Sequence, residues 1–399
     1  MTPGSPSAAA ATSAGATRLA IAGLMVLALL GRLPLAMLNL GLLLLVRDQG
    51  NSYAVAGAVA GASTVAMGLA APRIGRLADR VGAAPVLVGT GLVGMVTTAT
   101  LGAVPERLGI AGITALAVVA GGATPPIATV FRASLPRLVG QDRLGQMYAL
   151  EAACQELVYV VGPMLVLAIV AGADARAAVV VCGLLTGVVT AAFAAAVARH
   201  AAPPSATGRG GSVLANPRLR RILLAYLALG GTFGSIEVAA VAALEHLGER
   251  GASGVVLGAW AAGSFAGGVV VPRVWRASPA RRLSALLVIL DLLGIPLAAC
   301  ALAGPWALGA ALFAQGIAIA PTIGSVYELI PRITPENTLT EAFSWSIGSV
   351  VIGSSIGMAL SGLATSHAGG AVAMTLAVLF PTVAALTFDP RGTRWRDVK

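Results

Sequence analysis

The feature that most constrains this chain is a succession of long apolar segments separated by short polar ones. A helix needs about 20 apolar residues to cross a bilayer, and every segment reaches roughly that length. Barrel strands are excluded, because they are shorter and alternate between apolar and polar residues. The twelve segments are Leu19 to Val46, Tyr53 to Ala71, Pro85 to Val104, Ile110 to Val130, Leu144 to Val170, Ala175 to Val197, Ile222 to Leu244, Gly254 to Val274, Leu283 to Ala303, Trp306 to Ile330, Leu339 to Ala364 and Ala371 to Phe388. The sequence therefore predicts an all-α membrane protein with 12 transmembrane helices.

Composition and charge support this class and set an orientation. Apolar residues make up 57% of the 399, charged residues 11%, and the mean hydropathy is +0.88, which leaves too little polar surface for a water-soluble globule. Nearly all of the 26 basic residues fall in alternate loops, Arg132, Arg137 and Arg143 after the fourth segment among them. The positive-inside rule then places those loops and both termini in the cytoplasm, in a cell membrane. Arginines spread over short loops do not form the basic face that nucleic acid requires.

The chain divides into two similar halves. Pro72-Arg73 recurs as Pro272-Arg273, and Pro136-Arg137 recurs as Pro331-Arg332, each pair in equivalent loops. Such repeats predict two pseudo-symmetric six-helix bundles related by an axis along the membrane normal. The expected organisation is a disordered cytoplasmic tail at 1–17, an N-terminal bundle at 18–198, a cytoplasmic linker at 199–221, a C-terminal bundle at 222–388 and a cytoplasmic tail at 389–399.

The charged stretch from Gly75 to Gly82 reads Gly-Arg-Leu-Ala-Asp-Arg-Val-Gly between two apolar segments. It resembles the loop between helices 2 and 3 of the major facilitator superfamily of secondary transporters, although Ala83 and Ala84 stand where that family usually carries basic residues. The resemblance implies a cytoplasmic gate at Gly75, Asp79, Arg80 and Gly82. In this gate, Asp79 and Arg80 are expected to hold the two halves together in the outward-facing state, through charge pairs and through contact with the end of a helix.

Two further features bear on the direction of transport. Gly162-Pro163 resembles the glycine-proline signature of antiporters in this superfamily, without the glycines that usually follow. The fourth segment has no charge between Thr114 and Thr129, where proton-coupled drug exporters usually carry an arginine. We hypothesise that Arg32 substitutes for it.

Arg32 is the sharpest single candidate, because a charge at mid-bilayer is costly unless it is paired or wetted. It lies near the middle of the first segment, and Asn39 lies on the same helical face seven residues later. One interpretation is that Arg32 lines the central cavity, where it binds an anionic substrate group or pairs with a protonatable carboxylate. The other is a structural ion pair within the first half.

The fifth segment carries a polar stripe of Tyr148, Glu151, Gln155 and Tyr159, spaced to share one helical face. A desolvated carboxylate is a plausible proton carrier, so Glu151 is a candidate for proton transfer, as is Glu156 about 140° round the helix. The alternative for Glu151 is a structural bond to the nearby arginine loop.

Three other segments add polar candidates. Tyr226 and Glu237 share a face of the seventh segment, the repeat equivalent of the first, so we predict that Glu237 faces Arg32 across the cavity. The alternative is that Glu237 lies close enough to the outer surface to be wetted there. Asp291 in the ninth segment is expected to pack or to pair with an arginine. Gln315 and Thr322 in the tenth are expected to contact substrate or to bond backbone carbonyls.

These patterns predict a monomeric secondary transporter that exports a small molecule by proton antiport, embedded in the lipid bilayer. Proton symport or uniport that imports a small solute is the alternative, and a non-transporting membrane receptor or scaffold is the alternative of another class. An enzyme, a cofactor and a metal site are not expected, because the three histidines lie in loops and no metal-ligand or phosphate-binding spacing occurs.

Overall fold

The computed structural model describes residues 20–199, 212–275 and 277–388, and within these ranges the chain forms helices and turns without a strand. Eleven helical spans are long and apolar enough to cross a membrane, and Gly370–Leu386 is a shorter apolar helix. The predicted all-α membrane fold is thus confirmed. The tails predicted at 1–17 and 389–399 and most of the predicted linker lie outside the described residues.

The first half of the molecule consists of the first six spans. Residues 20–30 are helical and lead into α2. The remaining helices of this half are α2 (Leu33–Asp48), α3 (Tyr53–Val81), α4 (Ala83–Ala103), α5 (Pro105–Gly122), α6 (Ile127–Leu138), α7 (Gln141–Gly172) and α8 (Ala175–Ala198).

The second half contains the other six spans and three short 3₁₀ turns. In chain order its elements are η1 (Val213–Ala215), α9 (Pro217–His246), η2 (Arg250–Ala252), α10 (Ser253–Val274), α11 (Pro279–Gly294), α12 (Leu297–Ala303), α13 (Pro305–Gly316), α14 (Ile319–Ile333), η3 (Glu336–Thr338), α15 (Leu339–Ala368), α16 (Gly370–Ala373) and α17 (Leu376–Thr387). α9 begins five residues earlier than predicted, because the Asn216 side chain accepts a hydrogen bond from the Arg218 amide and Pro217 suits a first helical turn.

Several spans predicted to be continuous are broken. The fourth separates into α5 and α6 at Pro125-Pro126, and the ninth separates into α11 and α12 beside Pro296. Proline lacks an amide hydrogen and constrains the residue before it, so a helix ends there readily. The first span is also interrupted, at Gly31-Arg32. Irregular backbone at membrane depth is tolerated where protein buries it or where it lines a cavity.

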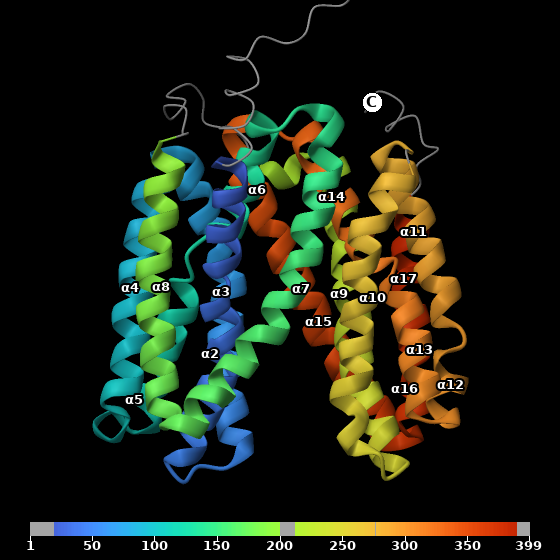
Figure 1. The fold of residues 1–399 in the computed structure, drawn as a ribbon, viewed down its shortest axis with the longest axis horizontal. Coiled ribbons are helices and arrows are strands. Elements are labelled where there is room, and N and C mark those ends of the chain that lie inside the picture. The colour runs from blue at the N-terminus through green and yellow to red at the C-terminus, as the bar shows by residue number, and fades with distance from the viewer. Residues whose placement is uncertain (1–19, 200–211, 276, 389–399) are drawn as a thin grey trace, which may run out of the picture.

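The apolar core shows how the two halves meet. One buried cluster, the shared cluster, contains residues of both halves, such as Leu135 and Tyr148 from the first and Leu283 and Tyr327 from the second. A second cluster, around Leu42, contains first-half residues only, and a third lies wholly within the second half. We call the end with the shared cluster the closed end and the opposite end the open end. In Figure 1 the closed end is uppermost, and the halves diverge toward the lower end.

The turn predicted at Gly75 to Gly82 is shorter than expected. α3 continues to Val81, and only Gly82, with a φ of 98°, turns the chain into α4. Gly75 therefore lies inside the helix, where its lack of a side chain has another use. A Cβ at this position would lie 2.8 Å from the carbonyl oxygen of Thr340 and would overlap the Ser344 hydroxyl. Gly75 allows α3 and α15 to pack closely at the closed end.

Candidate transport site and gate

Two arginines share one carboxylate in the buried centre of the first half. Glu151 of α7 is fully buried; its Oε1 lies 3.0 Å from Arg132 Nη2, and it also forms an ion pair with Arg32. Arg132 donates a further hydrogen bond of 2.6 Å to the Gln155 side chain. A guanidinium in such a place is stable only when paired and hydrogen-bonded, and Glu151 performs this role for both. The expected bond from Glu151 to the arginine loop is replaced by these deeper partners.

Arg132 was predicted to lie in a cytoplasmic loop, and that prediction was wrong. It lies inside α6 and is 1% exposed. The fourth span continues past the break at Pro125-Pro126 as far as Leu138. The predicted segment ended at Val130 and therefore excluded Arg132. The signal that could have revealed it is the amphipathic pattern of 127–138, where Phe131 and Leu135 recur at helical spacing beside Arg132.

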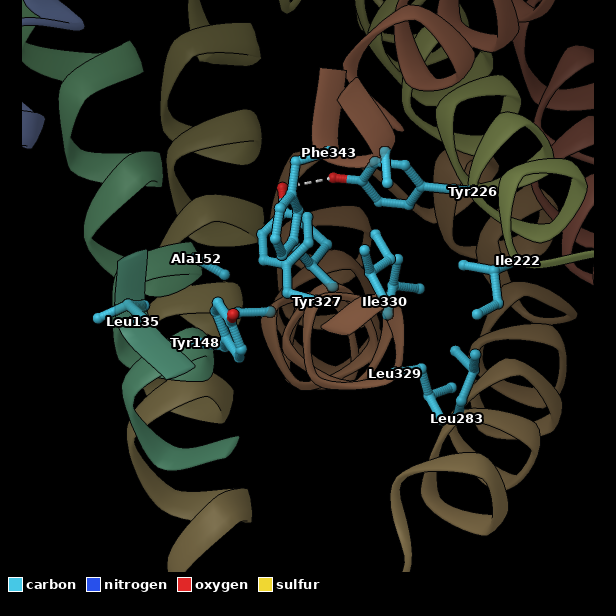
Figure 2. Packing of buried hydrophobic residues seen from close by; sticks show 14 of the residues in the cluster. Leu135, Tyr148, Ala152, Ile222, Tyr226, Leu283, Tyr327, Leu329, Ile330 and Phe343 are labelled. Carbon is cyan, nitrogen blue, oxygen red and sulfur yellow. Dashed lines mark hydrogen bonds between the residues drawn. The ribbon is translucent and has the colours of Figure 1, made fainter. Parts of the chain in front are cut away.

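An aromatic group connects this charged cluster to the second half. The Arg132 guanidinium lies 3.9 Å from the ring centroid of Tyr327 in α14, a cation–π contact between the halves. Tyr327 and Tyr226 of α9 share a hydrogen bond of 2.8 Å, drawn in Figure 2, and the Tyr148 hydroxyl donates to the Arg132 carbonyl. Phe343 of α15 packs against the rings of Tyr148 and Tyr327. We call this group the aromatic plug; it consists of the rings of Tyr148, Tyr226, Tyr327 and Phe343 together with Arg132.

Exposure increases along the polar side chains of α7 from the plug toward the open end. Gln155 and Glu156 are half-buried, and Tyr159 is 50% exposed. Glu237 of α9 is exposed, so each half places a carboxylate beyond the plug, toward the open end. The predicted pairing of Glu237 with Arg32 is not present in this conformation, because Arg32 pairs with Glu151 in its own half.

The closed end is held by polar contacts between α3 and the start of α15. Arg76 donates two hydrogen bonds, of 2.6 and 3.0 Å, to the Glu341 carboxylate. Asp79 accepts hydrogen bonds of 3.1 and 2.8 Å from the amides of Thr340 and Glu341. Arg80, expected to make the charge pair, is exposed, and Arg76 one turn earlier makes it instead.

Two other ionic groups lie at this end. Arg137 and Glu336 form an exposed pair between the halves, with 2.9 Å between Nη2 and Oε2. Within the second half, Glu328 pairs with Arg282 and Arg332. A Cβ at Gly145 of α7 would overlap the Glu328 carboxylate, so this group also lies against the first half.

The other predicted site residues have simpler surroundings. Asn39 is exposed and accepts a hydrogen bond from Thr64. Both carboxylate oxygens of Asp291 lie within hydrogen-bond distance of the Thr382 hydroxyl, and in the described part of the chain Asp291 does not pair with an arginine as one expectation had it. Thr322 donates to the Ala318 carbonyl, the backbone bond expected as the alternative to substrate contact. Gln315 is fully buried, and neither atom of its amide has a hydrogen-bond partner.

Gly162-Pro163 lies within α7, where this helix passes α2. A Cβ at Gly162 would lie 2.5 Å from the Ala36 Cβ and 3.1 Å from its carbonyl carbon. The glycine therefore allows close packing of α2 and α7.

These features define a class of protein. Two bundles of membrane-spanning helices meet at one end through a shared core and diverge at the other, with buried ionisable groups between them, which is the architecture of a secondary transporter. The profile of the Major Facilitator Superfamily matches residues 24–312, and the chain belongs to this family. It is thus a secondary transporter and not an enzyme.

Solved structures share the whole fold at low sequence identity. A bacterial homologue of the iron transporter ferroportin in an outward-facing state matches with a TM-score of 0.78 at 14% identity, covering 92% of this chain and 98% of its own. The human organic anion transporter MFSD10 matches with a TM-score of 0.70 at 15% identity, covering 94% of this chain and 99% of its own. The E. coli fucose:proton symporter matches with a TM-score of 0.69 at 13% identity, covering 93% of this chain and 97% of its own. No curated protein sequence matches the chain.

Proposed function

We propose that this transporter exports a small molecule across the cell membrane in exchange for protons. The observation that carries the proposal is the placement of Glu156 on α7 and Glu237 on α9, which gives each half one carboxylate beyond the aromatic plug, toward the open end. Repulsion between two carboxylates falls when one of them binds a proton. Proton binding would therefore change how closely the halves approach, which is the coupling that an antiporter requires.

In this proposal the closed end faces the cytoplasm, as the arginine-rich loops and the resemblance at Gly75 to Gly82 both favour. The described conformation is then outward-facing, and the similarity to a ferroportin homologue in that state supports this. The contacts of Arg76 and Asp79 with α15 act as the cytoplasmic gate. The aromatic plug forms the floor of the substrate path, and Arg32 and Glu151 lie behind it.

Direction and coupling can be tested together. A screen of drugs and metabolites on a deletion strain and an overexpressing strain identifies a substrate, and export predicts lower sensitivity on overexpression. Uptake of that substrate into everted membrane vesicles should then require an imposed proton gradient. Glu156→Gln and Glu237→Gln should each abolish the response to the gradient, because an amide cannot carry the proton. Glu249→Gln is the matched control, an exposed carboxylate near the open end.

Other outcomes would contradict the proposal in distinct ways. Dependence of growth on an external solute, with accumulation in intact cells, would indicate import by symport or uniport. Wild-type gradient dependence in both glutamine variants would remove the proposed proton carriers. A chain that moves no solute in any assay would support a receptor or scaffold.

A further inference from the structure

The charges buried around Glu151 do not balance. Arg32 is 7% exposed and Arg132 is 1% exposed, and the single carboxylate of Glu151 faces both. The two guanidiniums also repel each other electrostatically. Arg132 has compensating partners in Gln155 and the ring of Tyr327, whereas Arg32 pairs with Glu151 alone. The cluster thus carries one uncompensated positive charge, and an excess charge in a low-dielectric site favours a counter-ion.

The unused hydrogen-bonding capacity belongs to the same residue. The Nε and Nη1 of Arg32 are buried and have no hydrogen-bond partner. Leaving two charged donors unsatisfied is costly, and such groups usually bind a ligand or water.

Arg32 lines a cavity of about 70 Å³ between the breaks of the first and fourth spans. The hydroxyls of Thr124, Thr129 and Ser344, which also line it, donate to backbone carbonyls, and no acidic side chain lies on its walls. The remaining donors come from Arg32 and from the first turn of α6, since the amides of Ala128 and Thr129 have no acceptor within the helix. The positive end of the α6 dipole therefore lines the same cavity as Arg32, whose Nε and Nη1 have no partner.

We propose that this cavity binds a single small anionic group, of the size of chloride or a carboxylate, between Arg32 and the N-terminus of α6. About 10 to 15 Å³ of volume on this measure holds one water, so about 70 Å³ accommodates a small anionic group. The group is either a free anion or the carboxylate of a substrate that extends toward the open end. Ser344 and Ile347 of α15 close the cavity from the opposite half, so occupancy stabilises the conformation in which the halves meet here.

The experiment follows thermal unfolding of the purified full-length protein in increasing sodium chloride, formate or acetate. Sodium Mes, whose anion carries a sulfonate on a bulky morpholine ring and no carboxylate, keeps the ionic strength constant. A ligand that binds only the folded state raises Tm with its concentration, so a saturable rise is expected with the small anions and none with Mes. Arg32→Gln should weaken the apparent affinity by at least about tenfold, because charge-assisted hydrogen bonds are lost.

Ala71→Leu provides a second variant that leaves every charge in place. Ala71 lines the cavity, and the larger side chain should fill it and remove the anion effect while Arg32 still pairs with Glu151. Arg73→Gln is the matched control, since Arg73 is an exposed arginine two residues further along α3 and should behave as wild type. The proposal is overturned if the wild type shows no anion-dependent rise, or if Arg32→Gln and Ala71→Leu both retain it.

A series of linear monocarboxylates from formate to hexanoate separates the two sources of the anion. Affinity that increases with chain length indicates the carboxylate of a larger substrate, and affinity that is highest for chloride or formate indicates a free ion. The inference deepens the proposed function without sharing its test. Anion-dependent Tm without proton-coupled transport would overturn only the proposed function, and transport without an anion effect would overturn only this inference.

Discussion

At the scale of single residues, Glu151 determines whether the buried arginines are tolerated. Removing one partner of a buried ion pair leaves an unpaired charge and typically costs about 3 to 5 kcal/mol. Glu151→Ala leaves both Arg32 and Arg132 without their carboxylate, so we expect a loss of stability at the upper end of that range. Denaturant unfolding of the purified protein measures it.

The exposed pair of Glu106 and Arg176 is the matched control for that variant. Both side chains are about half exposed, and ion pairs of this kind contribute roughly 0 to 1 kcal/mol. Glu106→Ala should therefore leave the unfolding midpoint nearly unchanged. Equal losses in the two variants would mean that burial of Glu151 does not govern its contribution.

The hydrogen bond between Tyr226 and Tyr327 gives a second prediction at this scale. Tyr327→Phe keeps the ring over Arg132 but leaves the buried Tyr226 hydroxyl without a partner, at a cost of about 1 to 3 kcal/mol. The double variant with Tyr226→Phe should recover most of that loss, because neither hydroxyl remains. A double-mutant cycle on unfolding free energies measures the coupling, and strictly additive losses would contradict the expectation.

The residue-scale predictions succeed where the information is local. Helical spacing correctly placed Tyr148, Glu151 and Gln155 on one face, and all three contact Arg132. That their common partner is Arg132 could not be predicted in the same way. Arg132 lies beyond the proline break in the fourth span, and hydropathy alone does not locate such a break. Arg32 likewise pairs within its own half, which spacing alone left open.

At the scale of elements, the approach of α3 to α15 depends on Gly75. Gly75→Leu adds a side chain where even a Cβ overlaps Ser344, so the helices must move apart. We expect this variant to populate a conformation separated at the closed end, seen as a longer spin-label distance between α3 and α15. Gly57→Leu on the same helix is the control, because a Cβ there meets nothing within 4 Å. A wild-type distance in Gly75→Leu would contradict the close-packing role.

Element boundaries were less predictable than element number. Twelve apolar segments followed directly from length and hydropathy, since the bilayer fixes both. The charged stretch at Gly75 to Gly82 was interpreted as a loop because charges are rare inside spans, yet α3 contains most of it. α3 has 29 residues, more than the about 20 that cross the hydrocarbon, and the exposed Arg76 and Arg80 lie in its last two turns, so the charges need no loop.

At the scale of the whole molecule, transport requires the closed end to open. Cysteines at Arg137 and Glu336, joined by a bifunctional thiol reagent after the native cysteines are replaced, would connect the halves at an exposed ion pair. We expect cross-linked protein to remain folded and to lose transport, as measured in vesicles. Cysteines at Glu106 and Arg176 provide the control, because that pair lies within the first half and its cross-link should leave transport intact.

The sequence predicted two bundles but not which end would be closed. Internal repeats follow from the Pro-Arg matches, because equivalent loops keep equivalent residues. In a protein that alternates between two conformations, the one closed at the first end and the one closed at the other differ little in free energy. Sequence patterns therefore do not indicate which of the two conformations is adopted. Which end is closed becomes visible only in the structure, where one buried cluster contains residues of both halves and the other two clusters each lie within one half.

The bonds from Asp79 to the amides of Thr340 and Glu341 have a consequence for how rigidly the halves can move. Thr338, at the N-cap position of α15, makes no side-chain cap bond, so the first turn of this helix takes its acceptor from the other half. When the halves part at the closed end, those amides lose their acceptor and the turn should fray into water. Each cycle would then include a brief local melting of α15 and would not be a purely rigid rotation. Amide hydrogen exchange at Thr340 and Glu341 should accelerate during turnover, while the middle of the helix stays protected.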